Sequence, residues 1–117
     1  NLSFCNIAPS SVLIQRSLFE SVGIFDETLE VCEDYDLWLR ILMKHKIGLV
    51  AKKLITKYAG HEDQLSFKHW GMDRFRVITL EKLLQNQENI EDDKRQDIKN
   101  ELLKKYTLLL KGAVKYE

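Results

Sequence analysis

The chain has 117 residues, with 18 basic and 18 acidic side chains and 44% hydrophobic residues. This corresponds to one domain or less with a single core. The composition excludes a disordered chain, and apolar runs of only a few residues exclude a membrane-spanning protein. No secretory signal precedes the first expected elements, so the expected location is the cytoplasm, and Cys5 and Cys32 are expected to be free, partly buried thiols.

The equal charge totals hide an uneven distribution along the chain. Residues 20–36 contain seven carboxylates and no Lys or Arg, whereas residues 40–76 contain nine basic and three acidic residues. An acidic stretch followed by a basic one could bracket a site for a phosphorylated ligand and its metal. Two solvated faces explain the charge counts at least as well.

The first expected elements are a short strand and a short helix. Residues 11–15 form a β-rich run after Pro9 and Ser10, which predicts a strand. Residues 16–22 can form two helical turns, and Gly23 follows as the stop.

The strongest helical pattern begins in the acidic stretch 32–40. Asp36 precedes Arg40 by four residues, the favourable order for an ion pair on a helix surface. Asp34 belongs to the expected first turn, where backbone N–H groups can hold a partly desolvated carboxylate. The helix should end near His45 or Lys46. Its apolar side chains recur at three- and four-residue spacing and predict one buried face: Tyr35, Trp38, Leu39, Leu42 and Met43.

The second half of the chain is expected to turn from strands to helices. Residues 47–51 and 54–58 are strand candidates, and 59–66 is a polar loop of the kind that often carries function. Ser66 can cap a helix that ends around residues 86–89, and a last helix should run from about 90 to 111. That last helix needs a partner for its apolar stripe of Ile98, Leu102, Tyr106, Leu109 and Ala113.

Four segments carry a resemblance to a known family. They are Pro9-Ser10-Ser11-Val12-Leu13-Ile14, Arg16-Ser17-Leu18-Phe19, Val22-Gly23-Ile24-Phe25-Asp26-Glu27 and Glu33-Asp34-Tyr35-Asp36-Leu37-Trp38-Leu39-Arg40. Their order and spacing resemble the acceptor-side second half of a family 2 glycosyltransferase of the GT-A fold, over roughly residues 9 to 67. Residues 58–66 and 72–76 resemble the closing segment of a bacterial subgroup of that family.

The resemblance implies an α/β fragment that is predominantly helical. Short strands and a helix from the second half of a GT-A fold would occupy residues 1–67, and a C-terminal pair of helices would form an extension over residues 68–117. The βαβ nucleotide-binding half and the Asp-x-Asp metal motif of a complete enzyme do not appear in the sequence, and Asp34-Tyr35-Asp36 lies inside a helix in the wrong place for that motif. The chain therefore resembles a fragment that is inactive alone, with the missing N-terminal nucleotide-binding half as its partner.

The implied reaction is inverting transfer of a sugar from a nucleotide-sugar donor to a hydroxyl of a sugar or glycan acceptor, as in bacterial cell-surface polysaccharide synthesis. A base must take the proton of the attacking hydroxyl, and the family's base matches Asp34. Glu33 would shape the acceptor pocket, and Trp38 could stack on a sugar ring. The structural alternatives are that Glu33 and Asp34 complement a helix N-terminus and that Trp38 belongs to the core.

The resemblance also implies a divalent metal and a diphosphate-binding group. His61 would complete the coordination of Mg²⁺ or Mn²⁺ on the diphosphate, although a loop histidine is often an ordinary surface residue. Arg74 and Arg76 could bind diphosphate oxygens as charge grows on the leaving group. Two arginines on a solvated helix face are the alternative.

Two other functional classes stay open from the sequence: a helical protein–protein interaction module without catalytic activity, and a structural remnant. The enzyme hypothesis requires Asp34 and His61 to open on one cleft with Arg74 or Arg76 nearby. An exposed apolar patch, where the missing half would pack, could drive homodimer formation. No nucleic-acid partner is expected, and the inner face of the membrane is an alternative location to the free cytoplasm.

Overall fold

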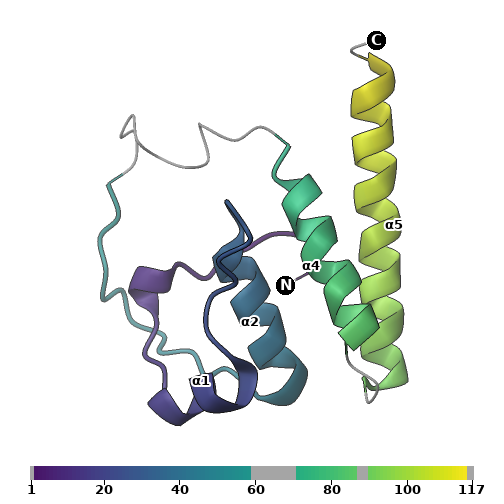
Figure 1. The fold of residues 1–117 in the computed structure, drawn as a ribbon. Helices are drawn as coiled ribbons and strands as arrows, with labels where there is room; N and C mark the ends of the chain where they lie inside the picture. The colour runs from purple at the N-terminus through teal and green to yellow at the C-terminus, as the bar shows by residue number, and fades with distance from the viewer. Residues whose placement is uncertain (1, 59–70, 87–89, 116–117) are drawn as a thin grey trace.

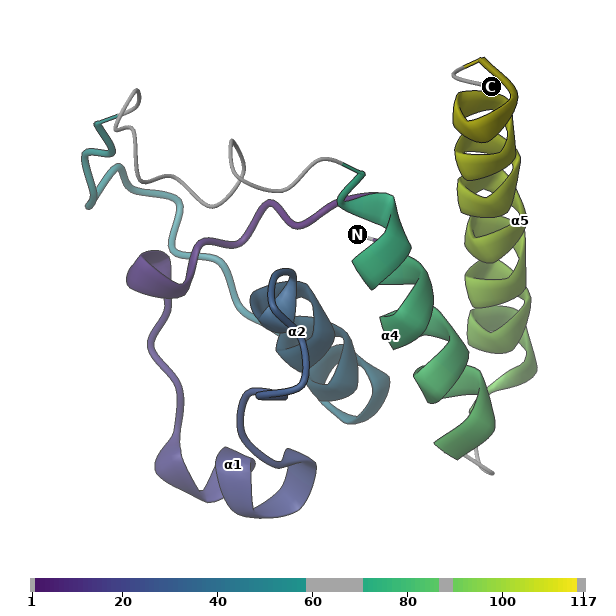
Figure 2. The same cartoon turned by 45° about the horizontal axis from the view of Figure 1, so that its top comes forward.

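The computed structural model describes residues 2–58, 71–86 and 90–115 and contains helices joined by extended segments (Figure 1). A 3-10 turn, η1, spans Pro9–Ser11. The helices are α1 (Arg16–Val22), α2 (Glu33–Lys44), α4 (Asp73–Asn86) and α5 (Asp92–Lys115). Helix α2 packs against α1 on one side and against α4 on the other, and α5 packs against α4 (Figure 2).

Helix α2 forms where the acidic stretch predicts it. Its first turn carries three carboxylates and its last turn carries Lys44, which complements the helix macrodipole at both ends. The helix ends as the His45 N–H donates to the Ile41 carbonyl over 2.8 Å. The predicted helix is therefore confirmed.

The burial of α2 differs from the single apolar face that the sequence predicts. Tyr35 and Leu39 face α4 and α5, whereas Trp38 packs with Leu37 and Ile41 against the N-terminal segment and α1. Helix α2 is thus buried on two sides and forms the centre of the fold. The first core cluster is completed by Val31, Cys32, Val77, Leu80, Leu83, Ile90, Ile98 and Leu102.

The predicted ion pair between Asp36 and Arg40 forms, but not on the surface. Arg40 donates to Asp36 Oδ2 over 2.8 Å, and Asp36 is only 3% exposed. The same guanidinium donates to the carbonyls of Val22 and Ile24. Arg40 therefore fastens the loop after α1 to the side of α2.

The expected α/β architecture is wrong for the described residues, which contain no strand. Residues 47–51 and 54–58 are extended without a ladder, and Leu49 is 91% exposed. Residues 9–11 form η1 instead of leading into a strand, and Leu13 is fully exposed. A segment whose side chains favour β structure forms a strand only beside a second strand that satisfies its backbone N–H and C=O groups. The described part of the chain supplies no such neighbouring strand.

The expected C-terminal pair of helices is present. Helices α4 and α5 are antiparallel neighbours, and Leu80 and Leu83 of α4 share the first core cluster with Ile98 and Leu102 of α5 (Figure 1). Ser66, the expected cap of the first of these helices, lies outside the described residues, as does the expected division of the chain after residue 67. Among the described residues, no helix combines the length and the apolar content that crossing a bilayer requires.

Candidate functional site at the N-terminus of helix α2

Asp34 lies on the first turn of α2 and is half-buried. Its Oδ1 accepts a hydrogen bond from the Tyr35 N–H over 2.7 Å, and its Oδ2 accepts a long one from Cys5 Sγ over 3.5 Å. The N-terminal segment that carries Cys5 crosses the start of the helix, since Trp38 Nε1 also donates to the Ile7 carbonyl over 2.9 Å. Asp34 is therefore held between the helix and this segment.

Cys32 precedes α2 in the left-handed backbone region, with φ 65° and ψ 21°. This conformation is strained for a residue with a Cβ. The Cys32 thiol donates to the Met72 carbonyl over 3.8 Å, which links the start of α2 to the residues just before α4. The strained turn thus sets the direction in which α2 and its first carboxylates leave the loop.

Neither cysteine near Asp34 is set up as a nucleophile. Burial raises the pKa of Cys32 to about 11, against the opposing effect of the Arg76 charge. Burial also raises the pKa of Cys5, and the Asp34 carboxylate adds to this. Both thiols stay protonated at neutral pH, so the thiolate form needed for attack is scarce.

Arg76 of α4 lies over the ring of Tyr35, the residue that follows Asp34 in α2. Its guanidinium carbon lies 6.0 Å from the centre of the Tyr35 ring, and its Nη1 donates to Asp73 Oδ1 over 2.9 Å. The positive charge of Arg76 lowers the pKa of Cys5 while the Asp34 carboxylate raises it, which places both charges around one thiol. The Nε of Arg76 is buried without a hydrogen-bond partner among the described residues.

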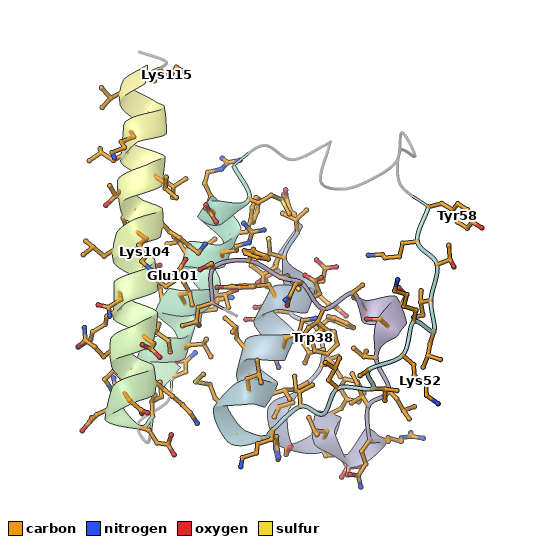
Figure 3. The ribbon with its side chains drawn as sticks, turned by 180° about the vertical axis from the view of Figure 1, so that it is seen from behind. Trp38, Lys52, Tyr58, Glu101, Lys104 and Lys115 are labelled. Carbon is orange, nitrogen blue, oxygen red and sulfur yellow. The ribbon has the colours of Figure 1, made fainter. Side chains whose placement is uncertain are left out.

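The other expected site residues are distributed differently. Glu33 is half-buried beside Asp34 on the first turn of α2. Trp38 is 5% exposed and lies inside the body of the protein (Figure 3), which favours its interpretation as core. Arg74 is exposed, and its guanidinium carbon lies 5.6 Å from the centre of the Phe75 ring. His61 lies outside the described residues.

One charged cluster next to this site was not found from the sequence. Lys105 of α5 is buried, and its Nζ donates to the Ser3 carbonyl at 2.7 Å and to Asp73 Oδ1 at 2.8 Å, with Glu101 Oε1 at 3.4 Å. Burial alone would raise the pKa of Asp73, but hydrogen bonds from Lys105 and Arg76 lower it below its ordinary value.

This cluster connects three helices. Lys105 of α5 forms an ion pair with Asp73 of α4, and Asp73 forms a second ion pair with Arg76 of the same helix. The guanidinium of Arg76 lies against the ring of Tyr35 of α2. From the sequence, Lys105 is one of several lysines that complement the end of the last helix. The available signal was the spacing of Glu101 and Lys105, four residues apart on one helix, which marks an ion pair but not its burial.

The described residues contain no group of three or more His, Cys, Asp or Glu side chains that could hold a metal ion. The site therefore consists of the carboxylates of Glu33 and Asp34, two protonated thiols and one arginine. Such a set can accept a proton and bind an anion. The proposed metal ligand, His61, lies in a part of the chain whose placement is not described.

One curated protein is similar to part of this chain. An uncharacterized glycosyltransferase of Rickettsia felis (strain ATCC VR-1525 / URRWXCal2) is 38% identical over 58 residues, which are 50% of this chain and 10% of that protein. The chain thus spans about a tenth of the length of this relative. No protein-family description matches the chain, and no solved structure does.

Proposed function

We propose that the chain contributes the acceptor-activating part of a glycosyltransferase, with Asp34 as the general base. The similarity to a protein described as an uncharacterized glycosyltransferase supports the reaction class. The observation that carries the residue assignment is the position of the Asp34 carboxylate, half-buried on the first turn of α2. Among the described residues, its Oδ2 accepts a hydrogen bond from one weak donor, Cys5, at 3.5 Å.

Asp34 Oδ2 has the capacity that a base requires. A thiol is a weak hydrogen-bond donor, so this oxygen can still accept a strong hydrogen bond from a substrate hydroxyl. The hydroxyl oxygen attacks the anomeric carbon of the donor sugar as its proton moves to Asp34. The bond from that carbon to the nucleoside diphosphate breaks, and the configuration at the carbon is inverted. Glu33, on the same turn, would bind and orient the acceptor.

Arg76 is the better placed of the two arginines for the diphosphate. It lies beside Tyr35 near the start of α2, and its buried Nε has donor capacity left among the described contacts. A guanidinium there would stabilise the charge that develops on the leaving diphosphate. Arg74, exposed at the start of α4, could add a weaker contact from solvent.

A divalent metal, Mg²⁺ or Mn²⁺, would supply further charge neutralisation at the diphosphate in the complete enzyme. The described residues do not form a donor set for it, so no step above depends on the metal. We propose His61 as its ligand from this chain. The nucleotide-sugar site itself would come from a nucleotide-binding part beyond these residues, which agrees with the small share of the relative that the chain spans.

The test of this proposal replaces Asp34 in the complete enzyme. Asp34→Asn should lower the transfer rate about 10²- to 10⁴-fold, because the amide cannot take the proton, while the affinity for the donor changes little. Glu30→Gln, which removes an exposed carboxylate from the preceding loop, is the matched control and should leave the rate unchanged.

Two results would contradict the assignment. Retention of transfer by Asp34→Asn would show that another group is the base. An equal loss of transfer and donor binding would show that Asp34 acts through the structure. The isolated chain should transfer no radiolabelled sugar, and turnover by it alone would refute the need for a second part.

A further inference from the structure

The C-terminal end of α5 extends beyond the N-terminal end of α4, which runs antiparallel to it (Figure 1). Leu103, Leu110 and Val114 are 68%, 67% and 67% exposed. At about 100° per residue these three side chains fall on one line along the helix. Residues 103–115 of α5 therefore carry a row of exposed apolar side chains.

A row of lysines runs beside this apolar row. Lys104, Lys111 and Lys115 share a second line, about a quarter turn from the first, and Figure 3 shows Lys104 midway along α5 and Lys115 near its end. The sequence from residue 102 to residue 115 contains no Asp or Glu. Lys104 approaches Glu101 at 3.7 Å yet keeps 70% of its side chain exposed.

Two carboxylates of the described residues contact this part of α5, and both are engaged on the side that faces the body of the protein. Glu101 is buried against Lys105, and Glu81 of α4 accepts a hydrogen bond from the hydroxyl of Tyr106. The outward surface of residues 103–115 is consequently apolar and positively charged. This charge sign is complementary to an anionic surface.

We propose that residues 103–115 dock on the surface of a membrane that contains anionic lipids. The apolar row would enter the boundary between headgroups and acyl chains, and the lysine row would contact lipid phosphates, the arrangement of an interfacial amphipathic helix. The inference is independent of the transfer reaction, since it involves no residue of the proposed catalytic site.

A second copy of the chain is a poorer occupant of the same surface. A stable coiled coil needs an apolar seam over about three to four heptads. Here the row runs only from Leu103 to Val114, and the same line holds Gln96 and Lys99 in the first half of α5. A lipid surface requires no such length and also uses the lysines.

The test measures co-sedimentation of the 117-residue chain with vesicles of phosphatidylcholine alone or with phosphatidylglycerol added. The chain should bind the vesicles with phosphatidylglycerol only. Each lysine near an anionic surface is worth about fivefold in affinity, so Lys104→Gln with Lys111→Gln should weaken binding about 30-fold. Leu103→Ser with Leu110→Ser should weaken it at least tenfold.

The chain offers matched controls in the segment after α2. Lys52→Gln with Lys53→Gln removes the same charge, and Leu49→Ser with Leu54→Ser removes two leucines that are even more exposed than Leu103 and Leu110. These variants should bind as the parent does, and circular dichroism checks that each variant is folded. Absence of vesicle binding, or equal losses in the control pairs, would overturn the proposal.

The competing occupant has its own signature. Light scattering after size exclusion would detect a dimer that forms without lipid. The proposal would be wrong if the parent chain did not bind vesicles and Leu103→Ser with Leu110→Ser abolished such a dimer. The exposed apolar row would then be a protein–protein interface.

Discussion

Replacing Lys105 with methionine tests whether the buried charged cluster holds α5 to α4 and to the N-terminal segment. Methionine keeps most of the side-chain volume and removes the ammonium group. The ammonium group of Lys105 donates hydrogen bonds to the Ser3 carbonyl at 2.7 Å and to Asp73 at 2.8 Å, and it lies 3.4 Å from Glu101. Only 3% of the Lys105 side chain is exposed. Loss of the ammonium group leaves carboxylates facing an apolar side chain.

The expected cost follows from the contacts that remain. Removing one partner from a buried ion pair typically destabilises a protein by about 3–5 kcal/mol. Asp73 keeps Arg76 and Glu101 keeps the Ser3 hydroxyl, so we expect the lower end, about 3 kcal/mol. For a chain of this length, each kcal/mol shifts Tm by about 4 °C, which gives a decrease of roughly 12 °C.

Urea denaturation followed by circular dichroism measures this change. Lys104→Met is the matched control, because Lys104 lies 3.7 Å from the same Glu101 but is 70% exposed; it should cost less than about 1 kcal/mol. If the two variants lost equal stability, the buried cluster would not hold these elements together.

The same cluster predicts a dependence on pH. The pKa of Asp73 is lower in the folded chain than its ordinary value of 3.8. Its contribution to stability is therefore present above about pH 4 and is lost as the pH falls through the folded-state pKa. In Lys105→Met the folded pKa of Asp73 should rise toward the ordinary value, so the loss of stability below pH 4 should become shallower. If stability fell equally steeply below pH 4 in the two proteins, Lys105 would not be lowering the pKa of Asp73.

Two further predictions concern Trp38 in the middle of α2 and Cys32 just before its start. Trp38→Ala should destabilise the chain by about 3–5 kcal/mol, because it opens a cavity in the core cluster of Leu37, Trp38 and Ile41. Trp38→Phe mainly loses the 2.9 Å hydrogen bond to the Ile7 carbonyl and should cost about 1–2 kcal/mol in a urea titration. Equal small effects of the two variants would mean that the indole is not part of the core. Burial raises the pKa of Cys32 from 9.0 to about 11, so its thiolate is scarcer in the folded chain than in urea. Cys32 should therefore react with iodoacetamide at pH 8 about 100-fold more slowly in the folded chain, as followed by mass spectrometry. Equal rates in the two conditions would show that Cys32 is not buried.

Local sequence was sufficient for the helices because their signals act within a few residues. Acids in the first turn and Lys44 in the last set the limits of α2, and Gly23, at φ 82°, ends α1 as predicted. The four-residue spacing of Asp36 and Arg40 was enough to predict their ion pair. The position of Asp34 on the first turn of α2 also follows from this local pattern.

Tertiary structure decided the features that depend on distant partners. The segments at 47–51 and 54–58 have β-rich side chains, yet a strand needs a neighbour for its backbone groups, and the described residues supply none. Lys105 is buried only because Ser3, 102 residues away, and Asp73 meet it. Arg76 likewise reaches Tyr35 through the packing of α4 on α2.

The sequence by itself therefore determined where the helices lie and that Glu33 and Asp34 share the first turn of α2, because helix periodicity and end effects are local. Only the tertiary structure decided that both sides of α2 are buried, that Arg76 lies against Tyr35 near that turn, and that Leu103, Leu110 and Val114 of α5 stay exposed. These properties depend on contacts between segments far apart in the chain, and no pattern within one segment specifies them.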